Sequence, residues 1–149
     1  MLMPFEGQCL TRRDIAVLYG GNARAFLPRV NGGDIVAGCF DPDMNPRVPY
    51  EILVHNAPNA ILNAQRFLEQ SAPRREVHDS AVRIPQSAIP VFLRRAPNVW
   101  EYVGRYCAVR YTEDPHEVEV RIYEIRPRIY ERHVKAYGQI RGILFLEEE

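Results

Sequence analysis

Hydrophobic and polar positions along the chain follow two different periods, and these periods predict the helices and strands. Residues 12–19 repeat apolar side chains at helical spacing; Thr11 is placed to cap this helix, Asp14 lies at its third position and Gly20-Gly21 ends it. Two similar stripes predict further helices at 57–72 and 127–138. Segments of alternating or continuous apolar character predict strands at 32–40 (after a turn), 50–56, 89–95, 99–112, 118–125 and 139–149.

These elements are intermixed, and most connections between them are too short for repeated crossover helices. The order predicts an α+β fold: a small mixed, mostly antiparallel sheet curled into a barrel, with about three flanking helices. There is no internal repeat and no linker-like stretch, so we expect residues 1–149 to form a single domain.

Composition and charge exclude several classes of protein. The 149 residues carry a net charge of +0, which argues against a highly basic protein that coats nucleic acid, although a local basic cleft remains compatible with it. No apolar run approaches the ~20 residues of a membrane span, and the start of the chain does not resemble a secretory signal. We therefore expect a cytoplasmic protein with no membrane partner.

The motifs of common catalytic and metal sites are missing from the sequence. The patterns HExxH and GxSxG, the P-loop and the dinucleotide-binding glycines do not occur, and the four histidines lack metal-ligand spacing. The three cysteines are widely spaced, which predicts neither a zinc site nor disulfides, and Cys39 and Cys107 are expected to be buried. We expect no catalytic residue, no metal and no cofactor; an enzyme with a carboxylate-based site is the alternative.

The predicted strand VWEYVGRYCAVRYT (99–112) is unusually aromatic. Strict alternation places one set of residues on one face: Trp100, Tyr102, Gly104, Tyr106 and Ala108. Val103, Cys107 and Val109 fall on the other face, which suits a core. A glycine inside a strand marks a bend or a close approach of a ligand or backbone. The aromatic face either holds a flat ligand or packs beneath helices, and the sequence leaves both open.

A second segment, YEILVHNAPN, carries a strand into a helix through His55, Asn56 and Asn59. Free backbone N–H groups at a helix start favour an anion such as a phosphate, and asparagine side chains bond the edges of bases. The structural alternative is that Asn56 caps the helix and His55 merely ends the strand. Arg94 and Arg95, the last residues of the predicted strand 89–95, either contact phosphate or form a surface pair.

Two segments together resemble SRA/YDG-type domains of the PUA-like superfamily. IPVFLRR…WEYVGRYCAVRY resembles the family's basic strand end followed by a Tyr-x-Gly-x-Tyr strand, here at 102–106, with Val103 in place of the name-giving Asp. VPYEILVHNAPN resembles the strand and loop that line the family's base pocket, and GGDIVAGC its first barrel strand. The likeness spans residues 32–112 and extends to the specificity domains of modification-dependent restriction endonucleases.

The resemblance implies a non-catalytic domain that binds double-stranded DNA, flips out a modified base and holds it between aromatic rings. Such a domain serves as the specificity module of a restriction or defence system, with the nuclease on another domain or subunit. The implied base pocket consists of Tyr50, His55, Asn56, Asn59, Trp100 and Tyr102, and the implied phosphate contacts are Arg94, Arg95 and Arg105. Acidic residues that would read a cytosine amino group are absent near 55–59, so the modification is not specified. The alternatives are a PUA-like RNA-binding module and a protein-interaction domain without a nucleic-acid ligand.

Overall fold

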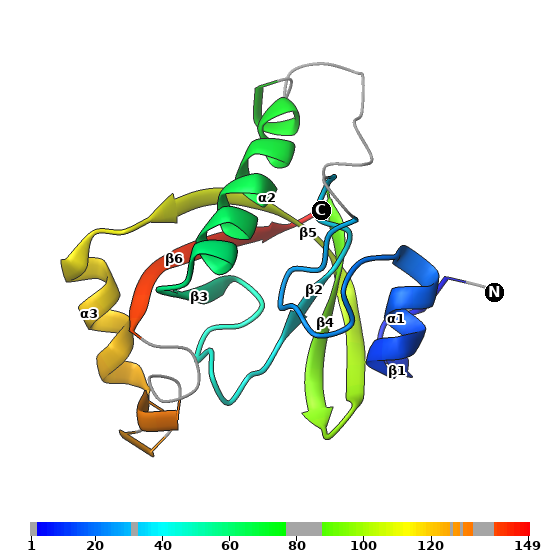
Figure 1. Cartoon of the computed structure of the whole chain (residues 1–149), viewed down its shortest axis with the longest axis horizontal. Coiled ribbons are helices and arrows are strands. Elements are labelled where there is room, and N and C mark those ends of the chain that lie inside the picture. The colour runs from blue at the N-terminus through cyan, green and yellow to red at the C-terminus, as the bar shows by residue number, and fades with distance from the viewer. Residues whose placement is uncertain (1–2, 31–32, 77–87, 126, 129, 133–138) are drawn as a thin grey trace.

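A computed structural model of the chain describes residues 3–30, 33–76, 88–125, 127–128, 130–132 and 139–149 (Figure 1). The elements in chain order are β1 (Cys9–Leu10), α1 (Arg12–Tyr19), β2 (Gly38–Phe40), β3 (Glu51–His55), α2 (Pro58–Glu76), β4 (Ile89–Ala96), β5 (Val99–Thr112), α3 (Pro115–Glu124) and β6 (Ile140–Glu148). Strand β1 was not predicted, β2 is shorter than the predicted 32–40, and α2 extends beyond the predicted 57–72. The polar sequence PRREVHDSAVRIPQSA (73–88) predicts an irregular segment after residue 72; its first residues belong to α2, and most of the rest lies outside the described residues.

The described strands form one six-stranded sheet in the order β2-β4-β5-β6-β3, and β1 pairs with the start of β5. Only the β2–β4 pairing is parallel among these strands, so the predicted α+β class with a mostly antiparallel sheet is confirmed. Within the described residues no pairing joins the edge strands β2 and β3. The sheet is therefore open, and closure into a PUA/SRA-like barrel stays a prediction.

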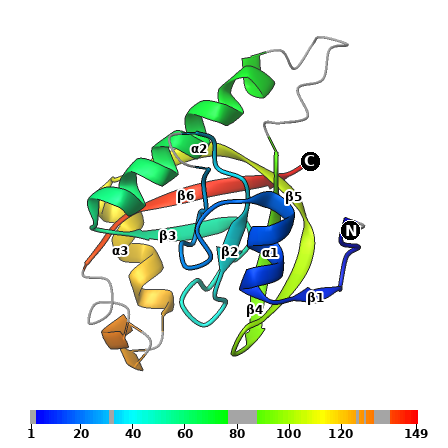
Figure 2. The same cartoon turned by 45° about the vertical axis from the view of Figure 1, so that its right-hand side comes forward.

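Helices cover both faces of this sheet (Figures 1 and 2). On one face, Ala60, Ala64 and Phe67 of α2 pack in the largest core cluster, to which β2 to β6 all contribute. The residues between these on β3 and β4 face the opposite side of the sheet. There Ile15 of α1 packs at the β2–β4–β5 end, and Val118 of α3 packs at the β3–β6 end. Each strand of the sheet is thus a core strand on at least one side.

Helix α1 forms as its sequence predicts. The Thr11 hydroxyl accepts a hydrogen bond from the Asp14 backbone N–H, the Asp14 carboxylate accepts one from the Thr11 N–H, and Gly20 ends the helix. This reciprocal capping box satisfies two backbone donors that a helix start otherwise leaves open. It fixes the position of Arg12, the first residue of the helix.

The strand predicted at 118–125 is wrong, because residues 118–124 belong to helix α3 and Ile125 is its C-cap. Val118, Ile122 and Ile125 repeat at helical spacing and pack on β3 and β6. Asp114 caps the helix through its carboxylate, and Pro115 occupies the first turn. The helix predicted at 127–138 lies largely outside the described residues; 127–128 and 130–132 are helical.

Strand β5 does not alternate strictly, and the predicted aromatic face is therefore wrong. The β4–β5 register shifts so that Val91 pairs with Gly104 and Phe92 with Tyr102, which leaves Val103 as a bulge. Residues 100 and 102 accordingly pack beneath α1, whereas residues 103, 106 and 108 pack beneath α2. Gly104 has a φ of 117°, a conformation that side-chain-bearing residues rarely adopt. It lies where the neighbour of β5 changes from β1 to β6.

Candidate functional site

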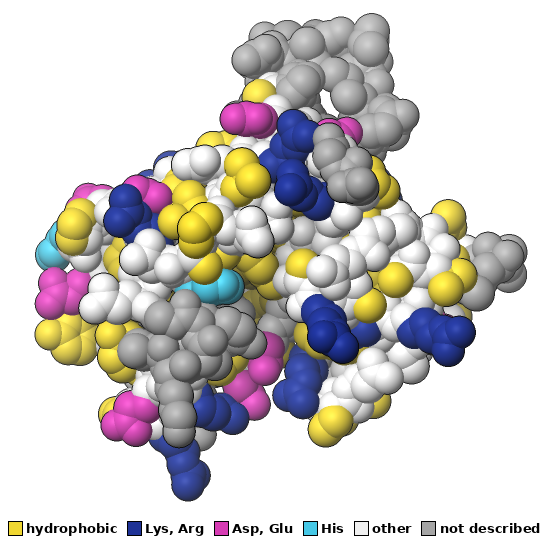
Figure 3. Space-filling model, in the orientation of Figure 1, with side chains coloured by type: hydrophobic (Ala, Val, Ile, Leu, Met, Phe, Trp, Pro, Cys, Tyr) yellow, Lys and Arg dark blue, Asp and Glu magenta, His cyan; other side chains and the backbone are white. Residues whose placement is uncertain are grey.

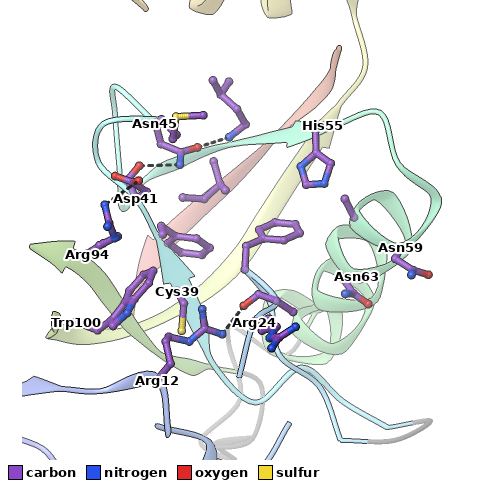
Figure 4. A pocket seen from close by; sticks show the side chains of 17 residues that line it. Arg12, Arg24, Cys39, Asp41, Asn45, His55, Asn59, Asn63, Arg94 and Trp100 are labelled. Atoms are coloured by element: carbon purple, nitrogen blue, oxygen red, sulfur yellow. Dashed lines mark hydrogen bonds and ion pairs between the residues drawn. The ribbon is translucent and has the colours of Figure 1, made fainter. Parts of the chain in front are cut away.

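A cavity of about 520 Å³ opens between the two edge strands of the sheet (Figure 4). Its walls come from β2, β3, the start of α2, the segments 24–26 and 41–45, and single residues of α1, β4 and β5. Ligand-binding pockets measure roughly 300–1,000 Å³, so this cavity is large enough for a small organic group. The lining residues run from Arg12 to Trp100, so segments far apart in the sequence meet here.

The segment after β2 closes one wall of the cavity by bonding to the edge of β3. The side-chain oxygen of Asn45, a buried residue, accepts a hydrogen bond of 2.8 Å from the Leu53 N–H, and its amide nitrogen donates to the Asp41 carbonyl at 3.1 Å. Asn45 thus takes the place of a neighbouring strand at that position. The Asp41 carboxylate lies 3.7 Å from the Arg94 guanidinium, which places one ion pair at this side of the cavity.

Arg12 forms a second wall and is held from three directions. Its Nη2 donates to the carbonyls of Ala25, at 2.6 Å, and Asn22, at 3.3 Å, while its Cζ lies 5.1 Å from the centroid of the Trp100 ring. Its Nε is buried and has no hydrogen-bond partner among the described residues. The guanidinium is therefore rigidly placed and keeps one donor unused.

Helix α2 supplies the opposite wall. Asn59 and Asn63 are four residues apart, so they share a helix face, and Ala60 keeps the wall shallow between them. Asn63 Oδ1 is buried without a hydrogen-bond partner in the described part of the chain. Native structures rarely leave buried polar atoms unpaired, because doing so costs about 1–3 kcal/mol. Both residues line the cavity, so its walls contain one unused acceptor, of Asn63, and one unused donor, of Arg12.

Aromatic rings form the floor and the rim. The rings of Phe26 and His55 lie 5.9 Å apart and are tilted by 54°, and Phe40 lies beneath them in the core. Burial lowers the pKa of His55, so its imidazole is neutral at neutral pH. Burial also raises the pKa of the Cys39 thiol to about 12, against the opposing effect of the Arg12 charge. Cys39 is therefore a protonated, unreactive thiol in the wall.

The charge of the lining is positive, with Arg12, Arg24 and Arg94 against the single carboxylate of Asp41. In the space-filling view, basic side chains gather near the centre of this face, close to a histidine (Figure 3). Flat rings, amides and excess positive charge together suit a planar ligand that carries an anionic group.

Residues 9–121 match the family described as a domain of unknown function, DUF6697. This match covers more than half of the 149 residues. The chain belongs to the DUF6697 family. No curated protein matches the chain, and no solved structure does.

Four of the nine residues that the sequence pointed to line the cavity of this DUF6697 domain: His55, Asn59, Arg94 and Trp100. They come from β3, α2, β4 and β5, and only the fold brings them together. Trp100 is 9% exposed and packs beneath α1, and Arg12 lies over its ring. Trp100 is therefore both a core residue and the support of a cavity arginine.

The other five lie outside the cavity lining. Tyr50 is exposed with its ring 5.9 Å from that of Tyr106, and Tyr102 packs on Phe92 at 5.4 Å. Asn56 is exposed, and Ala57 rather than Asn56 directly precedes α2, so the N-cap position is not that of Asn56.

The remaining two arginines are held by other groups. Arg95 pairs with Glu101 at 2.6 Å. Arg105 pairs with Glu149 at 3.2 Å and donates to the Ala88 carbonyl. The predicted phosphate contacts at these two positions therefore lie away from the cavity.

Sequence reasoning missed most of the polar lining: Arg12, Arg24, Asp41, Asn45 and Asn63. Asn63 had a usable signal, because it follows Asn59 by one helical turn. Arg12 had no such signal in the sequence, because no local pattern identifies the first residue of an amphipathic helix as part of a cavity.

Two further observations concern other classes of site in this domain. Among the described residues, no group of three or more His, Cys, Asp or Glu side chains is arranged to hold a metal ion. No helix in the described part of the chain has the length and apolar character needed to cross a bilayer.

Proposed function

We propose that the domain is a non-catalytic reader of double-stranded DNA that holds one flipped, modified base in the cavity between β2 and β3. The observation that carries the proposal is the assembly of His55, Asn59, Arg94 and Trp100 in one cavity with three further kinds of group. These are an arginine pair (Arg12 and Arg24), the ring of Phe26 and the amide of Asn63. The nuclease of such a restriction or defence system would reside on another domain or subunit.

The chemistry of the lining matches the needs of base flipping. Extruding a base from the duplex costs a few kcal/mol, and stacking on aromatic rings returns roughly 1–3 kcal/mol per base. Phe26 and His55 supply such rings at the rim. Asn59 and Asn63 supply amides that can bond the polar edge of a base.

In this proposal, residues other than Arg95 and Arg105 contact the phosphate. Arg12 and Arg24 lie at the cavity itself, together with Arg94. Asp41 adds an acidic group that the sequence did not place beside 55–59, and a carboxylate there can accept a hydrogen bond from an exocyclic amino group. The neutral Cys39 thiol offers no nucleophile, which fits a binding role.

A fluorescence-polarisation panel tests the proposal. Duplexes of one sequence carry a single unmodified, 5-methylated or 5-hydroxymethylated cytosine or an N6-methylated adenine, all at one salt concentration because phosphate contacts are salt-sensitive. We expect one modified duplex to bind at least about tenfold more tightly than the unmodified duplex, a difference worth about 1.4 kcal/mol. Equal affinity for every duplex, or no binding at low salt, contradicts the proposal.

Two additions make the panel specific. Asn59→Leu removes a cavity amide from an exposed helix position and should abolish the preference, whereas Arg95→Gln lies outside the cavity and should retain it. Single-stranded RNA of the same sequence serves as the competitor. Preferential displacement by RNA would favour an RNA-binding module over a DNA reader.

A further inference from the structure

Six arginines outside the cavity form ion pairs with glutamates in the described structure, whereas two of the three cavity arginines form none. Ion pairs join each of the following arginines to a glutamate: Arg47, Arg95, Arg105, Arg110, Arg121 and Arg141. Arg12 and Arg24 are not among the ion-paired arginines of the described residues, and Arg94 lies 3.7 Å from the Asp41 carboxylate. Two positive charges of the cavity lining therefore have no carboxylate partner among the described residues, and the lining holds one carboxylate, that of Asp41.

Arg12 is bound only to neutral groups. Its two hydrogen bonds go to backbone carbonyls and its face rests on Trp100, so within the described residues no carboxylate pairs with it. These contacts fix the guanidinium before any ligand arrives, which lowers the entropy lost on binding. The buried Nε remains as a donor.

Arg24 stands beside Arg12 at the same end of the cavity, on an exposed loop (Figure 4). The side-chain oxygen of Asn22 accepts a hydrogen bond of 2.8 Å from the Arg24 N–H, and the carbonyl of Asn22 accepts one from Arg12. Asn22 therefore binds the side chain of Arg12 and the main chain of Arg24, which holds the loop that carries Arg24. Two guanidinium groups at one end form a site for a compact anion, of which a phosphate is the best geometric match.

Helix α2 adds a group of the opposite hydrogen-bonding polarity to the lining, the side chain of Asn63. The buried Oδ1 of Asn63 lacks a donor among the described residues. A ligand that satisfies the arginines and Asn63 carries both an anionic group and an N–H donor. A single nucleotide has both, as its 5′-phosphate and the amino or imino groups of its base.

We infer that the cavity binds the base and the 5′-phosphate of one nucleotide, and therefore takes free nucleoside 5′-monophosphates as ligands. This inference rests on the proposed function, because it assumes that the cavity holds a base. The phosphate lies at Arg12 and Arg24, and the base edge faces Asn63. Recognition then needs little of the DNA outside the flipped unit, in keeping with a net charge of +0.

Calorimetric titration of the whole chain tests this inference with three sets of probes. These are the four deoxynucleoside 5′-monophosphates together with 5-methyl-dCMP, the corresponding deoxynucleosides, and inorganic phosphate. We expect at least one monophosphate to bind, and its deoxynucleoside to bind at least about tenfold more weakly, because charge-assisted bonds to arginine are the strong ones. Inorganic phosphate alone should bind more weakly than that monophosphate.

Arg24→Gln is the test variant, since the Arg24 side chain is exposed and its change should leave the fold intact. We expect it to reduce monophosphate affinity to that of the deoxynucleoside. Arg13→Gln, at an exposed position of α1 outside the cavity, is the matched control and should bind like the unaltered chain. Arg12→Gln is less suitable because it also removes two loop contacts.

The outcomes separate this inference from the proposed function. Absence of monophosphate binding in a protein that still prefers one modified duplex overturns the inference and leaves the proposed function in place. Equal affinity for monophosphate and deoxynucleoside also overturns it, as does equal loss in Arg24→Gln and Arg13→Gln. Monophosphate binding that depends on Arg24 supports it even when every duplex binds equally, and in that case only the DNA-reading proposal fails.

Discussion

The guanidinium carbon of Arg12 lies 5.1 Å from the centroid of the Trp100 ring, so the first residue of α1 rests on the most aromatic strand of the sheet. The sequence left open whether Trp100 is a core residue or part of a ligand site, and its contacts combine a core position with a place in the cavity lining. Trp100 packs in the core beneath α1 on one side and supports a cavity arginine on the other. Under the proposed function, we therefore expect a flipped base to stack on Phe26 and His55, because Arg12 already covers the indole.

Trp100→Ala should therefore lower the free energy of unfolding by about 3–5 kcal/mol, the usual cost of removing a buried Trp side chain. Trp100→Phe, which keeps a ring beneath Arg12, should cost clearly less. Chemical denaturation followed by circular dichroism measures both. A loss below about 1 kcal/mol for Trp100→Ala, the range of surface substitutions, would show that the ring is not part of the core.

Gly104→Ala should destabilise the fold by about 1–3 kcal/mol, because φ is 117° there and a side chain makes that conformation costly. Space is not the obstacle: an added Cβ would lie 3.4 Å from the ends of the Glu6 and Glu148 side chains, which can move. Urea unfolding gives the free energy directly. Unchanged stability would mean that the backbone at the Val103 bulge can adopt another conformation at residue 104 without a loss of free energy.

Asn45→Ala should cost about 1–3 kcal/mol, because it leaves the Leu53 N–H buried without its acceptor. The same change should speed hydrogen exchange of the Leu53 amide more than that of other β3 amides. Asn56→Ala, at an exposed position, is the control and should be close to neutral. Full protection of the Leu53 amide in Asn45→Ala would contradict the bridging role.

The stability of the domain should fall as the pH is lowered below about 6.5, and His55 should contribute to the fall. Burial lowers the pKa of His55 in the folded state. Between that lowered pKa and the ordinary value the unfolded chain binds more protons, so acid favours unfolding. His55→Gln should show a smaller loss of unfolding free energy between about pH 7.5 and pH 5.5 than the unaltered chain. Equal losses in the two proteins would show that His55 titrates alike in both states.

The segment 113–125 shows how far periodicity predicts structure here. VEVRIYEI fits a strand by its alternation, yet Val118, Ile122 and Ile125 also fit a helix. The deciding signal was Asp114-Pro115, a cap followed by a first-turn proline, immediately before the apolar residues. The same kind of signal, Thr11 with Asp14, predicted α1 correctly.

The long strand was predicted in position but not in the direction of its side chains. A single extra residue at Val103 reverses which face the following residues occupy. The alternation of apolar and polar residues does not reveal such a bulge, and Gly104 was the one local indication of it.

The cavity was predictable only in part, because its walls are built by long-range contacts. His55 and Asn59 are close in sequence and were found together, whereas Arg12 and Asn45 reach the site through a helix cap and a loop bridge. Their roles depend on the pairing of β2 with β4 and of β3 with β6, which the sequence does not specify.

Nuclear magnetic resonance of the side-chain N–H groups tests the central claim most directly. The nitrogen-15-labelled domain is titrated with the duplex that binds best in the panel, while the Arg Nε–H, Asn NH₂ and Trp indole signals are followed. The account predicts that Arg12 Nε–H and the Asn63 amide shift together with one affinity, and that Arg95 and Arg105 stay unchanged. Binding that shifts Arg95 and Arg105 but leaves Arg12 and Asn63 unmoved would contradict a base held in the cavity.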